Sequence, residues 1–154
     1  MLPFAEREES LRAYLSGRTD IAMAFLFGSV ATNQFTDESD LDVAVYFFPR
    51  SSALEWEEEL EFPDENAIWL DIDRIAAMET DLLVLNRAPA TVAYAVLEQD
   101  RPLFIKDLSL YWRFFLTVSS AAEDFREFTR EYWEIKKRAF RRHIVCRIGS
   151  GSIH

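Results

Sequence analysis

The sequence of 154 residues has one cysteine, four glycines and no long apolar run. The single cysteine, Cys146, excludes an internal disulfide and a cysteine-based zinc cluster. A membrane-spanning helix needs about 18–20 apolar residues, whereas the longest run here, Ile21 to Phe27, has only the length of a strand. The N-terminal MLPFAEREES has neither a basic start nor an apolar stretch, so no secretory signal is expected. We therefore expect a cytoplasmic protein without membrane contact.

Basic residues are scarce outside the last twenty positions. The formal net charge is −10, and residues 1–134 hold 11 of the 17 Lys and Arg and all 27 Asp and Glu, which gives this part a net charge of −16. A body this acidic repels a phosphate backbone, so nucleic acid is an unlikely partner. It would suit a basic protein partner, and an anionic substrate would need metal ions to enter.

Apolar residues, at 49% of the chain, suffice for a packed core. We predict an α/β (α+β) fold: a short mixed β-sheet flanked by helices, with a C-terminal helical extension. The expected domains are residues 1–106, a helical extension over 107–145 and a flexible tail over 146–154. The expected elements are helices over 4–16, 51–61, 64–78, 89–99 and from 107 onward, and strands over 21–27, 41–48, 82–85 and 102–105, the last at an edge of the sheet.

Two local patterns add to this prediction. Residues 68–72 alternate in hydropathy, so a strand there is an alternative to the helix over 64–78. Ser120 and Glu123 have the spacing of a capping box, which predicts the start of a new helix.

The stretch GSVATNQFTDESDLDVAVYF, residues 28–47, contains the residues best suited to chemistry. Asp40 and Asp42 are two positions apart at the start of a predicted strand, so their side chains point to the same side. Two carboxylates that close repel each other unless a cation lies between them, and magnesium prefers such oxygen ligands. Gly28 allows a tight turn beside a phosphate, and Ser29 adds a hydroxyl and a backbone N–H.

A two-metal phosphoryl-transfer site generally has a third carboxylate. Asp81 opens the next predicted strand and would reach the same edge if that strand lies beside 41–48. Asp71 and Asp73, also two apart, are the rivals, although within a helical pattern they are more typical of a solvated face. Asn86 and Arg87 could contact nucleotide or acceptor, but a surface turn is the preferred interpretation.

Gly28-Ser29, ten intervening residues and Asp40-Leu41-Asp42 resemble the GS-x10-DxD signature of the DNA polymerase β nucleotidyltransferase superfamily. More narrowly, the chain resembles the minimal nucleotidyltransferases (MNT domain), including the MntA-like antitoxins of HEPN/MNT toxin–antitoxin systems. TDLLVLNRAP, residues 80–89, is similar to the family's third-aspartate strand, and TVAYAVLEQDRPLF fits the helix and strand that follow. The chain departs from the family at Asp100, where a glycine is common before the last strand.

The resemblance implies an enzyme that uses ATP and Mg²⁺, with two ions expected. Gly28 and Ser29 would hold the triphosphate, Asp40 and Asp42 would bind the metal ions, and Asp81 would complete the second site and help to deprotonate the acceptor. It further implies AMP transfer to a tyrosine of a HEPN RNase toxin, which makes the chain an antitoxin. The alternatives are an antitoxin that occludes the toxin without catalysis, and a small-molecule nucleotidyltransferase of the aminoglycoside type. The second is disfavoured because those enzymes usually have a larger C-terminal domain.

Aromatic residues are frequent in the predicted C-terminal helices. Intrachain core is the preferred interpretation, and a partner or oligomer surface is the alternative. The basic cluster over 136–142 could contact RNA or an acidic face, or could complement a helix dipole. The aromatic residues are Tyr111, Trp112, Phe114, Phe115, Phe125, Phe128, Tyr132 and Trp133.

Overall fold

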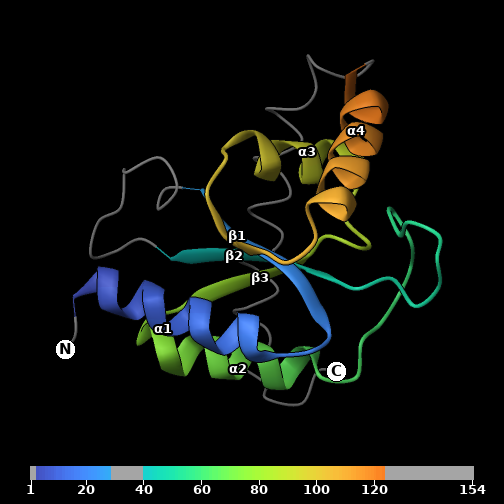
Figure 1. Ribbon diagram of the computed structural model, residues 1–154. Coiled ribbons are helices and arrows are strands. Elements are labelled where there is room, and N and C mark those ends of the chain that lie inside the picture. Colours follow the sequence, from blue (N-terminus) through green and yellow to red (C-terminus); the bar gives the residue numbers. More distant parts are fainter. Residues whose placement is uncertain (1–2, 29–39, 124–154) are drawn as a thin grey trace.

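The computed structural model describes residues 3–28 and 40–123 (Figure 1). The predicted strands are confirmed, as are the helices over 4–16, 64–78 and 89–99, with boundaries within two residues of the prediction. The helix predicted from 107 onward is confirmed as far as Glu123. None of the helices in these residues has the length and hydropathy needed to cross a membrane. In chain order the elements are α1 (Phe4–Gly17), β1 (Ile21–Phe27), β2 (Leu41–Phe47), α2 (Glu65–Ala76), β3 (Thr80–Val84), α3 (Ala90–Glu98), β4 (Pro102–Ile105) and α4 (Leu108–Glu123).

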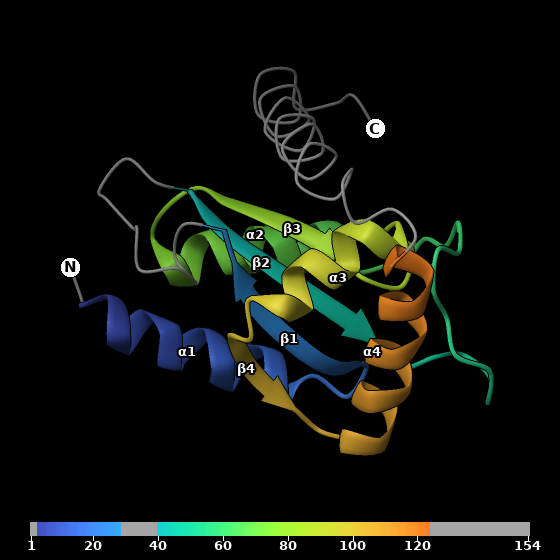
Figure 2. The same cartoon turned by 90° about the horizontal axis from the view of Figure 1, so that it is seen from above.

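The strands form one mixed sheet in the order β3-β2-β1-β4 (Figure 2). β1 is antiparallel to both of its neighbours, β2 and β4, whereas β2 and β3 are parallel. Every residue of β1 and β2 is buried, as a nearly continuous apolar run predicts for a strand covered on both faces. The expected mixed sheet with β4 at one edge is therefore confirmed.

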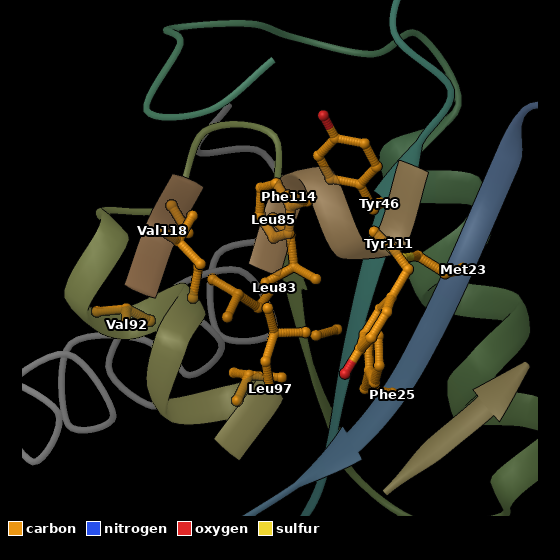
Figure 3. Packing of buried hydrophobic residues seen from close by; sticks show 14 of the residues in the cluster. Met23, Phe25, Tyr46, Leu83, Leu85, Val92, Leu97, Tyr111, Phe114 and Val118 are labelled. Atoms are coloured by element: carbon orange, nitrogen blue, oxygen red, sulfur yellow. The ribbon is translucent and has the colours of Figure 1, made fainter. Parts of the chain in front are cut away.

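Helices cover both faces of the sheet. Figure 1 shows α1 and α2 together on one face and α3 and α4 on the other. Because strand side chains alternate between faces, the two faces build separate apolar clusters. The cluster under α1 and α2 includes Leu11, Leu15, Ala24, Leu26, Val43, Val45, Ile68 and Ile72. The cluster under α3 and α4, shown in Figure 3, includes Met23, Phe25, Tyr46, Leu83, Leu85, Val92, Leu97, Tyr111, Phe114 and Val118.

Side chains of the helices also bond to the two outer strands. Arg12 of α1 donates from Nε to the carbonyl of Leu103 in β4, at 2.6 Å. The pairing of β4 with β1 shifts register beside Leu103, and β4 begins with Pro102. At the other edge, Trp69 of α2 donates from Nε1 to the carbonyl of Thr80 in β3, at 2.8 Å. Both edge strands thus have backbone carbonyls bonded by helix side chains.

The helix predicted over 51–61 is wrong. The sequence pattern of this segment favours a helix, but its backbone forms hydrogen bonds with residues that are distant in the sequence. The hydroxyl of Tyr46 donates to the carbonyl of Glu55 at 2.6 Å and accepts the N–H of the same residue at 3.1 Å. Glu58 donates its N–H to the carbonyl of Asn86, and Glu57 has a φ of 52°, which a right-handed helix does not allow. These tertiary bonds override the helical propensity of the segment.

Two further predictions about helices are corrected or decided by the structure. Residues 68–72 lie within α2, so the alternative strand is wrong, and its hydropathy comes from one buried helix face. The side chain of Asp64, the residue before α2, makes no capping hydrogen bond to the helix, and its carboxylate pairs instead with Arg18 at 2.9 Å. Ser120 lies inside the last turn of α4 and therefore does not begin a helix.

Several sequence predictions concern residues outside the described ranges. They include Ser29, the aromatic residues from Phe125 onward, the basic cluster and the flexible tail. The domain boundary after residue 106 stays a prediction. α4, which begins at Leu108, contributes Tyr111 and Phe114 to the same cluster as α3.

Candidate active site

Three strand ends meet at one end of the sheet. β1 finishes where β2 begins, because these strands are antiparallel, and β3 begins beside β2, because that pair is parallel. The register pairs Asp42 with Phe27 on one side and with Asp81 on the other. Neighbouring strands lie about 4.8 Å apart. Asp42 and Asp81 are therefore adjacent, although 38 residues separate them in the sequence.

Both carboxylates face the same side of the sheet. In β2, Asp42 alternates with Ala44 and Tyr46, and in β3, Asp81 alternates with Leu83, and all these neighbours belong to the cluster under α3 and α4. Asp42 is 1% exposed and Asp81 is 2% exposed. Two ionised carboxylates in such a place repel each other, so the arrangement favours a cation between them.

Asp40 lies immediately before β2, two positions from Asp42, and is half-buried. This position places a third acidic residue at the same end of the sheet. The chemistry of the donor set, carboxylate oxygens alone, fits Mg²⁺, which typically takes one or two carboxylates and completes its shell with water and phosphates. Among the described residues, no three acidic, histidine or cysteine side chains already converge on one point. The fit therefore depends on two adjacent carboxylates and not on a complete protein cage.

Gly28 follows β1 directly and has a φ of 75°. This left-handed conformation is accessible to glycine at little cost, whereas a β-carbon would strain it. Its backbone N–H donates to Oε1 of Gln99 at 2.8 Å. Gly28 thus turns the chain at the same end of the sheet as Asp42 and Asp81. Ser29, the second residue of the predicted phosphate-binding pair, lies outside the described residues.

The rival aspartates lie on the opposite face of the sheet. Asp71 and Asp73 belong to α2. Asp71 accepts a hydrogen bond from the hydroxyl of Tyr14 at 2.5 Å and pairs with Arg74, and these contacts lower the pKa of its carboxyl. Asp73 accepts hydrogen bonds from the backbone N–H and the side chain of Thr80. The structure therefore brings Asp81, and neither Asp71 nor Asp73, next to Asp42.

Asn86 lies in the turn after the far end of β3, as predicted, but it is fully buried, so the prediction that it lies at the surface is wrong. Its side chain accepts from the N–H of Phe47 at 2.9 Å, and donates to the carbonyl of Phe47 at 3.0 Å and to Glu55 at 2.9 Å. Arg87 pairs with Glu65 and bonds the carbonyl of Leu60. Both residues serve the fold at a distance from Asp42.

Asp100 has a φ of 53°, so the turn before β4 adopts the left-handed conformation that explains the family's usual glycine. Aspartate tolerates this region better than most residues. The departure at Asp100 therefore leaves the turn geometry intact. The preceding residue, Gln99, reaches the candidate site, and sequence reasoning missed it because a bond over 71 positions has no local signal.

Comparisons of the whole chain with known proteins point to a nucleotidyltransferase domain. The sequence matches the family described as polymerase beta, nucleotidyltransferase over residues 9–109. No curated protein sequence matches significantly.

Three solved structures share the fold. A chain from a toxin–antitoxin crystal structure with AMP-PNP is 16% identical, with a TM-score of 0.59 over 86% of this chain and 97% of that one. A chain from a mutant MntA–HpeT toxin–antitoxin complex is 14% identical, with a TM-score of 0.57 over 86% and 97%. A chain from the complex of tri-AMPylated Shewanella oneidensis HEPN toxin with MNT antitoxin is 16% identical, with a TM-score of 0.58 over 89% and 98%.

Proposed function

Because the chain belongs to the polymerase beta nucleotidyltransferase family, we propose that it transfers AMP from ATP to a hydroxyl of a protein partner. The observation that carries this proposal is the register pairing of two buried carboxylates, Asp42 and Asp81, beside the Gly28 turn. A nucleotidyltransferase needs these features close together: acidic ligands for metal and a turn that receives phosphates.

Each residue has a distinct task in the proposed reaction. Asp40 and Asp42 would hold Mg²⁺, and Asp81 would complete a second ion site. The ions, when bound, neutralise charge on the phosphate oxygens and on the attacking oxygen. Gly28 and Ser29 would receive the triphosphate through backbone N–H groups and the serine hydroxyl.

The bond changes follow from this placement. The acceptor oxygen attacks the α-phosphorus in line, forms the new P–O bond and displaces pyrophosphate. Asp81, the register partner of Asp42, would accept the proton that the acceptor hydroxyl loses. Because Asp42 and Asp81 are almost fully buried, such a site would limit the competition of water with the acceptor for the α-phosphorus.

The partner we propose is a HEPN-domain RNase toxin, with one of its tyrosines as the acceptor, so that the chain acts as an antitoxin. Chains with the same fold occur in complexes of toxins and antitoxins, one with AMP-PNP and one with a tri-AMPylated HEPN toxin. The net charge of −10 supports an electrostatic attraction to a partner with a basic, RNA-binding surface.

The test is a transfer assay with ATP labelled at the α-phosphate, Mg²⁺ and a HEPN protein. We expect label on the HEPN protein with the wild type and at least a hundredfold less with Asp42→Asn, since that change removes a metal ligand. Asp71→Asn is the matched control, because it makes the same change on the opposite face, and it should retain activity. A tight complex without label would refute catalysis and support simple occlusion of the toxin.

A further inference from the structure

The turn between α3 and β4 reaches the end of β1 through one side chain. Gln99, which ends α3, accepts the backbone N–H of Gly28 on its Oε1 at 2.8 Å. β4 pairs with β1, and this pairing brings two segments 71 positions apart into contact. The contact therefore exists only in the folded sheet.

The backbone that carries Gln99 is itself fixed. The backbone carbonyl of Arg101 accepts a hydrogen bond from the N–H of Leu26 at 2.9 Å, and the Arg101 guanidinium pairs with Glu8 of α1 at 2.8 Å. Asp100 lies between, in the left-handed conformation. Arg101 thus ties the segment before β4 to both β1 and α1, two residues after Gln99.

The hydrogen bond to Gln99 restricts the backbone conformation of Gly28. Glycine has no side chain to restrict its backbone, and many conformations compete with the φ of 75° seen here. A hydrogen bond to its N–H selects one of them. Gly28 also follows Phe27, whose register partner is Asp42, so its conformation sets where the chain leaves the sheet beside the candidate metal ligands.

We infer that Gln99 is a positioning residue for nucleotide binding: its amide oxygen holds the Gly28 turn in the conformation that receives the triphosphate. This inference rests on the proposed function, because it assigns Gln99 a part in the same site. One neutral hydrogen bond of this kind corresponds to a change of roughly two- to tenfold in an equilibrium constant.

The experiment replaces the amide and leaves the chain length unchanged. Gln99→Met removes the acceptor oxygen, and Glu98→Met makes the same replacement at the neighbouring, exposed position. We expect Gln99→Met to raise the dissociation constant of Mg²⁺–AMP-PNP, measured by calorimetry, and the KM for ATP by about three- to tenfold. The kcat at saturating ATP should change less than about twofold, because the bond acts before chemistry.

A second measurement reads the contact directly. Amide hydrogen exchange of Gly28, followed by nuclear magnetic resonance, should become faster in Gln99→Met and return toward the wild-type rate in Gln99→Glu, which keeps an acceptor oxygen. Glu98→Met should leave both the exchange rate and the nucleotide affinity at the wild-type values.

Each result has one meaning. An unchanged exchange rate in Gln99→Met overturns the contact, and faster exchange with unchanged affinity and KM overturns the positioning role. Equal losses of affinity in Gln99→Met and Glu98→Met also overturn it. If the wild type binds no Mg²⁺–AMP-PNP, the proposed function fails and this inference fails with it. That outcome is visible before any variant is measured.

Discussion

Removing one of the two buried carboxylates should stabilise the protein and abolish the proposed transfer activity. Asp42 and Asp81 are register partners on neighbouring strands and are 1% and 2% exposed. Two unit charges about 5 Å apart repel by roughly 3 kcal/mol at an effective dielectric constant of 20. Asp81→Asn keeps the shape of the side chain and removes this repulsion. Part of the gain is offset because the amide is also a buried polar group.

We therefore expect Asp81→Asn to increase the free energy of unfolding by about 2 kcal/mol in EDTA at pH 8. For a chain of this size, that gain raises Tm by roughly 4–8 °C. Thermal unfolding followed by circular dichroism measures the shift. Glu59→Gln makes the same change of charge at an exposed position, and should alter Tm by less than about 1 °C.

Magnesium should reverse the order of stability. A cation that binds the two carboxylates stabilises the wild type by mass action, whereas Asp81→Asn loses one ligand and gains little. The wild-type Tm should therefore rise above that of the variant when Mg²⁺ and AMP-PNP are added. An Asp81→Asn protein that is less stable than the wild type in EDTA would refute the reasoning, because repulsion would then not dominate this pair.

Three further perturbations test other parts of the structure. Asn86→Ala leaves the N–H and carbonyl of Phe47 and the carboxylate of Glu55 without their amide partner. The free energy of unfolding, measured in urea, should therefore fall by about 3–4 kcal/mol. A fall of less than about 1 kcal/mol would contradict a stabilising role for these three hydrogen bonds. Burial raises the pKa of Tyr46 above its ordinary value of 10.0, so its contribution to stability is complete below pH 10 and is lost as the pH rises above it. In Tyr46→Phe the free energy of unfolding should therefore fall less steeply between about pH 9 and 11 than in the wild type. The same pH dependence in both proteins would contradict this role of the Tyr46 hydroxyl. Gly28→Ala forces a β-carbon into a φ of 75°, which costs about 1 kcal/mol and should weaken Mg²⁺–AMP-PNP binding; full retention of affinity would show that this turn does not receive phosphate.

The strands and the candidate acids were predictable from the sequence because their signals are local. The run from Ile21 to Phe27 is apolar at every position, which is typical of a strand buried on both faces, and β1 has these same bounds. Asp42 opens an apolar strand where a charge is costly without a partner. The adjacency of Asp81 to Asp42 depends on the parallel pairing of β2 and β3; from the sequence this neighbourhood was only a condition, and the register now provides it.

The failures share one physical cause, which is bonding between distant segments. Residues 51–61 have the composition of a helix, yet the bonds of Glu55 with Tyr46 and Asn86 hold the segment in another conformation. The sequence pattern around Asn86 is typical of a turn, and it gives no sign that the side-chain amide bonds the backbone of Phe47, 39 positions away. Gln99 has no sequence signal at all, since its partner Gly28 is 71 positions distant. Hydrophobic periodicity predicts elements and does not predict such contacts.

The hydrogen bonds from helix side chains to the edge strands β3 and β4 affect how this domain can bind other proteins. Pro102, the register shift at Leu103 and the Arg12 bond disrupt β4 as a template for an added strand, and Trp69 occupies a carbonyl of β3. Recognition by extension of the sheet is therefore disfavoured. Contacts with other proteins are expected on the helices, where α4 leaves Trp112 and Leu116 more than half exposed. The sheet that carries the candidate site is thus a poor template for strand addition at either edge.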